Sequence, residues 1–524
     1  MSTRPNVVVV LADDMGFSDL GCFGSEIDTP NLDRLGAEGV RLNQFYNTAR
    51  CSPSRASLLT GHHPHSTGVG ILTEDDRPYG YPGELSLNVS TMAERLKAFG
   101  YATCLSGKWH LTNSLDEPSM SWPTRRGFDD FYGILGGAGD YFRPRGLYRG
   151  TTHLDVPTDP DYYFTDAIGE HGADFVRQQV KRGQPFFLYL AFTAPHWPLH
   201  APEEDVARYT DRFNQGWDEL RRRRFERQRA SGVLGDEATL SERDPDEPAW
   251  DDVANKDWQC HRMAVYAAQV DRMDKAVGSV MDALAESGAD ENTLIIFLSD
   301  NGASHETMPP PDAPAFVERQ PQHTVTGAPL PIGNDPSIWP GAEDTFASYG
   351  RAWANLSNTP FRRYKSWVHE GGIATPLLAR WPAGDLAAGA LVESPHQLTD
   401  ILPTVLAAVG GGHAMVDGLP GRSMLPAWRA SDVEDAEHTL YWEHIGNCAI
   451  RRGDHKAVRT ADGAWELYDL SVDRSELHDL APTAPGLLAG LVAAWKQWAD
   501  DVGVKDWATY GQPPATATAT GGHT

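Results

Sequence analysis

Cysteine, long apolar runs and basic residues are all scarce in this sequence. The five cysteines among 524 residues are odd in number and scattered, which indicates neither a disulfide framework nor a zinc cluster. No apolar run is long enough to cross a bilayer as a helix. Because 45 lysines and arginines stand against 72 aspartates and glutamates, the formal net charge is −27. A surface of that sign repels nucleic acid and anionic membranes.

The N-terminal residues lack the features of a secretion signal. The apolar run in MSTRPNVVVVLADD is short, is followed by two aspartates and has no small-residue cleavage site, so we expect a cytoplasmic protein. The chain is longer than one hydrophobic core usually supports, which predicts two domains. We expect a large catalytic domain over residues 1–412, a small α+β domain over 413–510, and a disordered low-complexity tail over 511–524.

Four short apolar runs are typical of buried strands in a parallel sheet, with helical patterns between them. Each run is followed by residues that carry charge or can bind a metal. In open α/β sheets ligands bind beyond the carboxyl ends of the strands, so we expect these residues to form one site. The runs and their followers are Asn6–Ala12 with Asp13 and Asp14, Tyr101–Ser106 with Lys108 and His110, Pro185–Thr193 with His196, and Leu294–Ser299 with Asp300 and Asn301.

The residues after these strands favour a site for a tetrahedral anionic ester. Asp13, Asp14, Asp300 and Asn301 offer only oxygen ligands, which favour Ca²⁺ or Mg²⁺ over zinc. A metal there would polarise the ester, cations would hold its oxygens, and a histidine would protonate the leaving group. Taken singly, each residue has a simpler interpretation, because an aspartate after a strand is often a turn former and a lone histidine is usually structural. The cationic side would come from Arg55, Lys108, His110, His196 and Lys365.

The stretch Arg50-Cys51-Ser52-Pro53-Ser54-Arg55 stands at the start of a predicted helix. Pro53 suits a first helical position and Ser52 suits an N-cap. Cys51 would then lie at the positive end of the helix dipole, where a thiol loses its proton more easily. The local alternative is a small buried residue beside a helix start.

The remaining segments support further structural predictions. Thr375–Trp381 predicts a strand, and Gln397–Val409 and Pro485–Val502 predict helices. Residues 215–257 are rich in Arg, Glu and Asp, which favours a solvated helical insertion. Residues 303–358 form a long stretch with much proline and glycine, which we interpret as a wall or lid over the site.

The stretch CSPSRASLLTG resembles the signature of the type I, formylglycine-dependent sulfatases, C-x-P-x-R followed by a short helix ending in Thr-Gly. The match runs from Asn6 to about Pro382 and looks most like the soluble bacterial arylsulfatases. It implies an alkaline-phosphatase-like α/β fold with a large, mostly parallel mixed sheet flanked by helices, plus a smaller C-terminal domain with an antiparallel sheet and a helix. The other matching blocks, in order, are VVVVLADDMGFSDLGCFG, TPNLDRLGAEGV, GYATCLSGKWHL, APHWPLHAP, VYAAQVDRMD, SDNGA and RRYKSWVHEGGIATP.

The resemblance also implies a modified nucleophile and a metal. Cys51 would be oxidised after translation to Cα-formylglycine by a modifying enzyme that reads Pro53 and Arg55. The hydrated aldehyde would attack the sulfur of a small sulfate ester, and its second hydroxyl would then allow sulfate to be eliminated. The implied ligands of Ca²⁺, with Mg²⁺ as the alternative, are Asp13, Asp14, Asp300, Asn301 and the modified residue 51.

Individual catalytic roles follow from the same resemblance. Asp300 would take the proton of the attacking hydroxyl, and His110 the proton of the second hydroxyl. Arg55 and Lys108 would steady the diol and the sulfate. Lys108, His196 and Lys365 would bind the substrate, with His196 as proton donor to the leaving oxygen.

Two other functions stay open at this point. A phosphonate monoester or phosphodiester hydrolase of the same superfamily would share the metal and the strand-end layout, although the DDMG, GKWH and APHWP blocks favour a sulfatase. A non-catalytic binding protein would result if Cys51 remained a thiol in its host.

Overall fold

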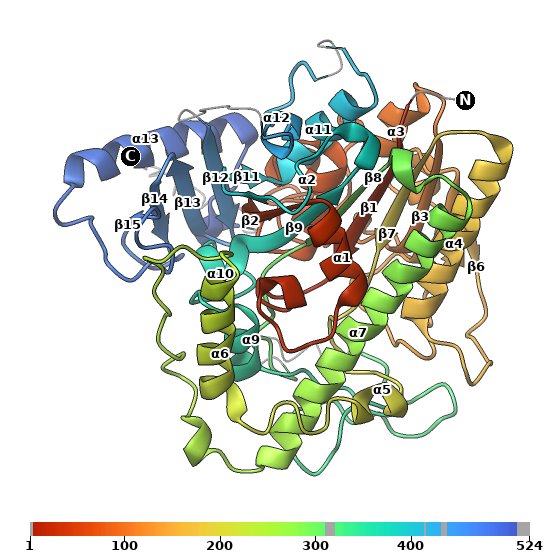
Figure 1. Ribbon diagram of the computed structural model, residues 1–524, viewed down its shortest axis with the longest axis horizontal. Coiled ribbons are helices and arrows are strands. Elements are labelled where there is room, and N and C mark those ends of the chain that lie inside the picture. The colour runs from red at the N-terminus through yellow and green to blue at the C-terminus, as the bar shows by residue number, and fades with distance from the viewer. Residues whose placement is uncertain (1–3, 310–319, 413–415, 431–437, 511–524) are drawn as a thin grey trace, which may run out of the picture.

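The computed structural model describes residues 4–309, 320–412, 416–430 and 438–510 (Figure 1). The whole predicted tail, 511–524, therefore lies outside the described residues, and the tail stays a prediction. The largest element is a sheet of eleven strands. Across the sheet the order is β10 (Leu391–Val392), β2 (Val40–Tyr46), β9 (Ala374–Arg380), β8 (Thr293–Ser299), β1 (Asn6–Ala12), β7 (Phe186–Ala191), β3 (Ala102–Lys108), β4 (Asp130–Ile134), β5 (Leu147–Arg149) and β6 (Thr152–His153), with β11 (His396–Gln397) beside β2.

The sheet is mixed but mostly parallel, as predicted. Strands β8, β1, β7, β3 and β4 run parallel to one another. Strand β9 is antiparallel to both β8 and β2, and β5 and β6 form an antiparallel edge. The four apolar runs identified in the sequence form β1, β3, β7 and β8, which are adjacent in the sheet. Their carboxyl ends therefore meet at one edge.

Helices cover both faces of this sheet because the central strands are apolar on both sides. In β1, Val8 and Val10 belong to one hydrophobic cluster, while Val7, Val9 and Leu11 belong to another. Burying each such side chain contributes about 1.5–3 kcal/mol. The first face is covered by α1 (Pro30–Glu38), α4 (Phe164–Arg182) and α7 (Lys256–Glu286), and the second by α2 (Cys51–Thr60), α3 (Met92–Lys97), α11 (Ile401–Ala408) and α12 (Leu425–Trp428) (Figure 1).

The charged insertion predicted for residues 215–257 contains α6 (Gly216–Ala230). Arg222 and Arg223 are exposed, but Arg221 and Arg224 are buried, so a fully solvated helix is wrong. Arg224 lies 2.7 Å from carboxylate oxygens of both Asp19 and Glu26. These ion pairs fasten α6 to the loop after β1. Further short helices are α5 (Glu203–Ala207), α9 (Arg351–Ser357) and α10 (Glu370–Ile373).

A second sheet forms the C-terminal part, as predicted. Its antiparallel strands are β12 (Thr439–His444), β13 (Asn447–Arg452), β14 (His455–Arg459) and β15 (Glu466–Asp469). One face, through Leu440 and Trp442, joins the hydrophobic cluster of the large sheet, and the other face packs on α13 (Pro485–Val502). The domain boundaries at residues 412 and 510 stay predictions.

Helices in the described part of the chain are either too short or too polar to cross a membrane. The cytoplasmic location expected from the N-terminal residues stays a prediction.

Candidate active site

The residues that follow the four central strands lie together, buried, at the carboxyl edge of the sheet. Backbone hydrogen bonds fix the strand ends: Asp13 N donates to Ala194 O at 3.0 Å, and Asp300 N donates to Ala12 O at 3.1 Å. Asp14 adopts a left-handed backbone with φ 67°, and its N–H donates to Asp300 Oδ1 at 3.2 Å. A non-glycine residue in this region stores strain, which is typical of functional sites.

Each carboxylate of the site has a cationic partner. Lys108 Nζ donates to Asp13 Oδ2, and Lys365 Nζ donates to Asp14 Oδ2 at 2.9 Å. Arg55 Nη2 donates to Asp300 Oδ2 at 2.9 Å and lies 3.5 Å from Asp13 Oδ2. The predicted site residues other than His110, which is partly exposed, are less than 5 % exposed, so these charges are held in a low dielectric.

Burial and the neighbouring charges shift the pKa values of two carboxyls in opposite directions. Burial opposes ionisation of Asp13, but the charges of Lys108, His196 and Arg55 outweigh it and hold the pKa of Asp13 well below its usual value. Burial, together with the negative charge of Asp13, raises the pKa of Asp300 to about 7. The two neighbouring carboxyls therefore differ in their affinity for a proton.

Two buried oxygens of the site have no hydrogen-bond partner among the described residues. They are Asp13 Oδ1 and Asn301 Oδ1. A buried polar atom left without a partner costs about 1–3 kcal/mol, and a hard cation bound by oxygen ligands would remove this cost. Asn301 Nδ2 donates to Asp14 Oδ1 at 2.6 Å, so the amide oxygen points away from that bond. The donor set fits Ca²⁺ or Mg²⁺.

Cys51 is the first residue of α2, and it is 3 % exposed. The prediction of Ser52 as N-cap is wrong. Arg50, with an extended backbone, is the N-cap, and Ser54 N donates to Arg50 O at 3.0 Å. Burial raises the pKa of the Cys51 thiol, although Lys108 and Lys365 oppose the shift. The easier ionisation expected from the helix dipole is therefore wrong, because the loss of water outweighs the nearby positive charge.

His110 is held as a neutral imidazole beside the cations. Burial, with the positive charges of Lys108 and Arg55, lowers its pKa well below the usual value. Its backbone has φ 57°, and its Nδ1 has no partner in the described part of the chain. Gly137 leaves space for the ring: a Cβ there would lie 2.6 Å from His110 Nε2.

His196 presents one ring nitrogen to the site. Its Nδ1 lies 2.7 Å from Trp197 O, and because a carbonyl only accepts, Nδ1 carries a proton. Nε2 lies 3.4 Å from Asp14 Oδ2. Burial lowers the pKa of His196 although Asp14 and Asp13 act against it.

Sequence reasoning missed Glu306, a half-buried carboxylate of the same site. Its oxygens accept from Arg50 Nη1 at 2.9 Å, Trp197 Nε1 at 2.7 Å and Lys365 Nζ at 3.1 Å. Burial acts against ionisation, but the charges of Lys365 and Arg50 hold the pKa of Glu306 well below its usual value. The available signal was its place in SDNGASHE, shortly after Asp300. Glu306 fixes the positions of two cations that face residue 51.

Part of the wall predicted for residues 303–358 lies beside the loop that carries His196. Leu199 N donates to Ala347 O at 3.0 Å, and the rings of Trp197 and Phe346 have centroids 5.7 Å apart. Residues 310–319 lie outside the described residues, and a lid function stays a prediction.

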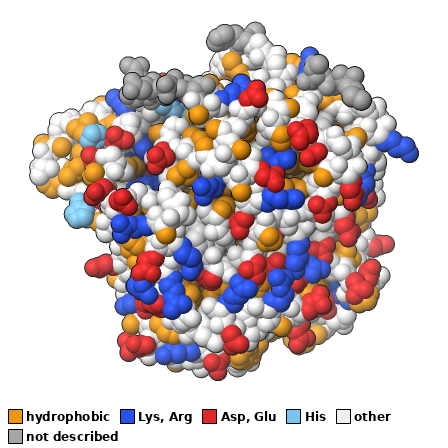
Figure 2. All heavy atoms as spheres, viewed as in Figure 1, with side chains coloured by type: hydrophobic (Ala, Val, Ile, Leu, Met, Phe, Trp, Pro, Cys, Tyr) orange, Lys and Arg blue, Asp and Glu red, His pale blue; other side chains and the backbone are white. Residues whose placement is uncertain are grey.

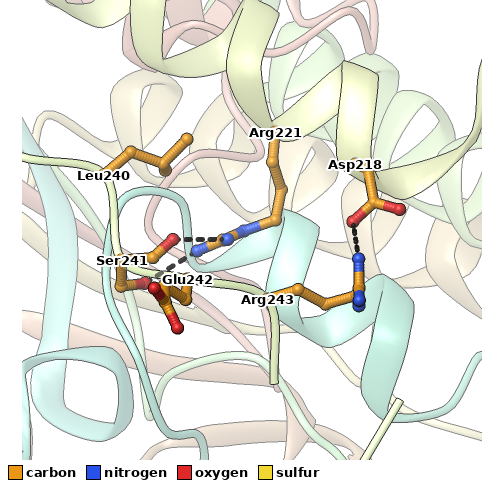
Figure 3. Close-up of a pocket in the computed structure, with 6 residues that line it drawn as sticks. All are labelled: Asp218, Arg221, Leu240, Ser241, Glu242 and Arg243. Atoms are coloured by element: carbon orange, nitrogen blue, oxygen red, sulfur yellow. Dashed lines mark hydrogen bonds and ion pairs between the residues drawn. The ribbon is translucent and has the colours of Figure 1, made fainter. Parts of the chain in front are cut away.

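A hollow between α6 and residues 240–243 is separate from the site at the strand ends (Figure 3). Its volume is about 400 Å³, but the two arginines that line it are already bonded to neighbouring residues. Arg243 Nη1 donates to Asp218 Oδ1 at 2.9 Å, and Arg221 donates to the backbone and side chain of Ser241 at 2.8 and 2.9 Å. The predicted site residues do not line it, so the strand ends remain the candidate active site.

Comparison with known proteins decides the family. The family model Sulfatase matches residues 5–411. The chain belongs to the sulfatase family. This sulfatase is 33 % identical to an uncharacterized sulfatase of Schizosaccharomyces pombe, over 96 % of this chain and 95 % of that protein. It is 34 % identical to the arylsulfatase of Klebsiella aerogenes, over 78 % of this chain and 87 % of the relative.

Solved structures agree with this assignment. The structure of Ps i-CgsB in complex with k-i-k-neocarrahexaose matches this sulfatase with a TM-score of 0.69 and 25 % identity, over 97 % of this chain and 95 % of that one. The phosphonate monoester hydrolase of Agrobacterium radiobacter shares the fold, with a TM-score of 0.58 and 20 % identity over 95 % of this chain and 96 % of that one. The family and its arylsulfatase members identify this sulfatase as a sulfuric ester hydrolase with an alkaline-phosphatase-like fold.

Proposed function

We propose that this sulfatase hydrolyses aryl sulfates, and alkyl sulfates as further substrates, with formylglycine formed from Cys51 and with bound Ca²⁺ or Mg²⁺. One observation supports this most strongly. Cys51 lies buried at the start of α2, where the charges of Lys108, Lys365 and Asp13 act on it, and the neighbouring Asp13 and Asn301 have unpartnered oxygens. A cysteine so placed is a poor thiolate but is well placed as the precursor of another nucleophile.

The metal would act as the electrophilic group and the modified residue as the nucleophile. Asp13, Asp14, Asp300 and Asn301 would hold the ion, which supplies a Lewis acid for the sulfate group when bound. The hydrated aldehyde supplies the attacking oxygen, and forming it requires a modifying enzyme as partner.

The remaining residues act on charges and protons. Lys108 and Lys365 would hold the sulfate oxygens, and Arg55 would keep its position through its bonds to Asp300 Oδ2 and to Lys108 O, 3.0 Å away. His196 would act in its doubly protonated form, which a bound anionic substrate favours, so that Nε2 gives a proton to the leaving oxygen while Nδ1 keeps the ring fixed. His110 is neutral with Nδ1 unpaired, so it would accept the proton of the second hydroxyl.

Mass spectrometry of residue 51 tests the proposal. Trypsin cuts after Arg50 and Arg55 and releases the peptide Cys51–Arg55. In active enzyme this peptide should lack sulfur, contain an added carbonyl oxygen and react with a hydrazine. Cys51→Ala should abolish both the reaction with hydrazine and turnover. Finding only a free thiol in fully active enzyme would refute the mechanism.

Phosphonate monoester hydrolysis is the second candidate, supported by the shared fold with the Agrobacterium radiobacter enzyme. Both substrates are tetrahedral oxyanions, so the same cations can hold either one. Parallel measurements of kcat/KM on nitrophenyl sulfate and on a phosphonate monoester separate them. The larger value should be obtained with the sulfate.

A further inference from the structure

Two histidines and an aspartate form a second buried cluster, away from the strand ends that carry the catalytic residues. His396 lies in β11 at the edge of the large sheet, and Asp400 ends the 3-10 turn η7 (Leu398–Asp400) that leads into α11. His438 directly precedes β12, the first strand of the small sheet. The three residues are 6 %, 0 % and 7 % exposed. The cluster therefore connects the two sheets at a buried point.

The three side chains lie close enough together to share one metal ion. Asp400 Oδ2 lies 3.3 Å from His396 Nδ1 and 3.3 Å from His438 Nε2, and one ligand atom from each residue lies within 4.8 Å of the others. Hydrogen bonds from a cationic nitrogen to a carboxylate are typically about 2.7–2.9 Å long. In a tetrahedral zinc site with bonds of about 2.0–2.1 Å, neighbouring ligand atoms lie about 3.3–3.4 Å apart. The observed distances match the zinc geometry better than short charged hydrogen bonds.

Surrounding groups orient these side chains as they do around bound metals. Ser394 Oγ lies 3.1 Å from His396 Nε2, the ring nitrogen that faces away from Asp400. Arg422 N donates to Asp400 Oδ1 at 2.8 Å, on the oxygen not shared by the histidines, and Gln397 N donates to Oδ2 at 3.0 Å. Such outer contacts fix the ring orientation and the basicity of metal ligands.

We propose that His396, Asp400 and His438 bind Zn²⁺, with a water molecule as the fourth ligand. Two imidazoles and one carboxylate suit a borderline ion such as zinc, whereas the oxygen-only catalytic set suits calcium. The ion clamps the start of β12 to the edge of the large sheet. Each histidine side chain keeps 8 % exposure, so an ion can reach the cluster from solvent. This site is independent of the catalytic proposal.

Metal titration of the full-length protein tests the zinc site. The protein is stripped with a chelator, saturated with Ca²⁺ and titrated with Zn²⁺, and in a parallel experiment with Co²⁺. We expect one equivalent of Zn²⁺ in the wild type, visible absorption bands of tetrahedral Co²⁺, and a Tm that rises with Zn²⁺. In His438→Gln and His396→Asn the affinity should fall by at least about 100-fold and the Co²⁺ bands should disappear.

The variants separate a metal site from a hydrogen-bonded cluster. The Gln and Asn amides can still donate to Asp400 Oδ2, so a hydrogen-bonded cluster keeps its contacts in both variants. His455→Gln, in β14 of the same small sheet and outside the cluster, is the control and should bind zinc as the wild type does. The proposal is overturned if the wild type takes up no zinc, or if His438→Gln takes up the same amount with the same Co²⁺ spectrum.

Discussion

At the scale of single residues, the two histidines of the site differ in what surrounds them. His196 is fixed by the carbonyl of Trp197 and presents Nε2 to Asp14, while His110 has an unpaired Nδ1 and a strained backbone. The proposed roles, with His196 acting before the alcohol leaves and His110 after it, can therefore be tested separately.

His196→Ala should therefore slow alkyl sulfates far more than nitrophenyl sulfate. A general acid contributes about 10²–10⁴-fold in rate, and its help matters most when the departing oxygen is basic. Steady-state rates over a series of leaving-group pKa values measure this dependence. His110→Ala should instead lower the turnover number of every substrate toward a common value. It should also give a pre-steady-state burst of nitrophenol. If both variants respond equally to the leaving-group pKa, the two roles are assigned wrongly.

Gly137→Ala should disturb catalysis through His110 alone. The new Cβ would lie 2.6 Å from His110 Cε1 and Nε2, so the ring has to move. A displacement of about 1 Å can cost 10²-fold in rate, and we expect a loss of about that size in kcat with little change in Tm. Gly136→Ala is the matched control, because its Cβ would meet only Leu115 Cδ1, 4.0 Å away. Equal kcat values in the two variants would show that the position of His110 does not matter.

At the scale of elements, the strand ends bring the oxygen ligands together, so the metal should depend on the end of each strand. Asp13→Ala and Asp300→Ala should each lose the bound ion and lower activity by more than about 100-fold, because a ligand and a charge are removed together. Elemental analysis and sulfate release measure the two effects. Asp290→Ala is the control, because Asp290 lies in the turn before the start of β8. It should change neither the bound ion nor the activity. Unchanged activity of the wild type in a calcium chelator would contradict the metal assignment.

Elements with a strong local pattern could be predicted from the sequence, and those set by distant contacts could not. Strand β1 and helix α13 begin and end at the predicted residues, and β3, β7, β8 and β9 lie close to their predicted ranges, because buried apolar runs are local signals. That the strand ends lie at one edge could be predicted from the parallel topology of the sheet. The burial of Arg224 could not be predicted, because its partners lie near the N-terminus, far away in the sequence. Glu306 was missed for the same reason: only the fold brings it to Arg50 and Trp197.

At the scale of the whole molecule, a buried ion network joins the small sheet to the catalytic part. Lys456, in β14, lies 2.9 Å from Glu370 Oε1 in α10 and 2.8 Å from Glu476 Oε1, with all three side chains buried. Figure 2 shows that charged side chains of both signs are spread over the visible face, and isolated surface pairs of that kind contribute little. The network under the small sheet is different because it is shielded from water.

Lys456→Met should therefore destabilise the protein strongly. Removing the cation takes the ion pair away from buried Glu476 Oε1 and leaves Glu370 with Arg474, 3.3 Å away, as its cationic partner. Breaking a buried ion pair in this way costs about 3–5 kcal/mol. Thermal unfolding at a fixed scan rate should show a large drop in Tm. Lys496→Met, at an exposed position of α13, is the control and should leave Tm nearly unchanged. A similar Tm for both variants would mean that the network does not hold the two parts together.

The burial of Cys51 limits when a modifying enzyme could reach its side chain. Every residue of α2 is buried, and Trp442 of the small sheet, which is translated late, donates its indole N–H to Asn47 O at 2.9 Å, shortly before Cys51 in the chain. If Cys51 is the precursor of formylglycine, as proposed, the modifying enzyme would have to reach it before the chain folds, so oxidation would compete with folding. Molecules that fold first would keep a thiol. The active fraction of a preparation would then depend on the relative rates of oxidation and folding during synthesis.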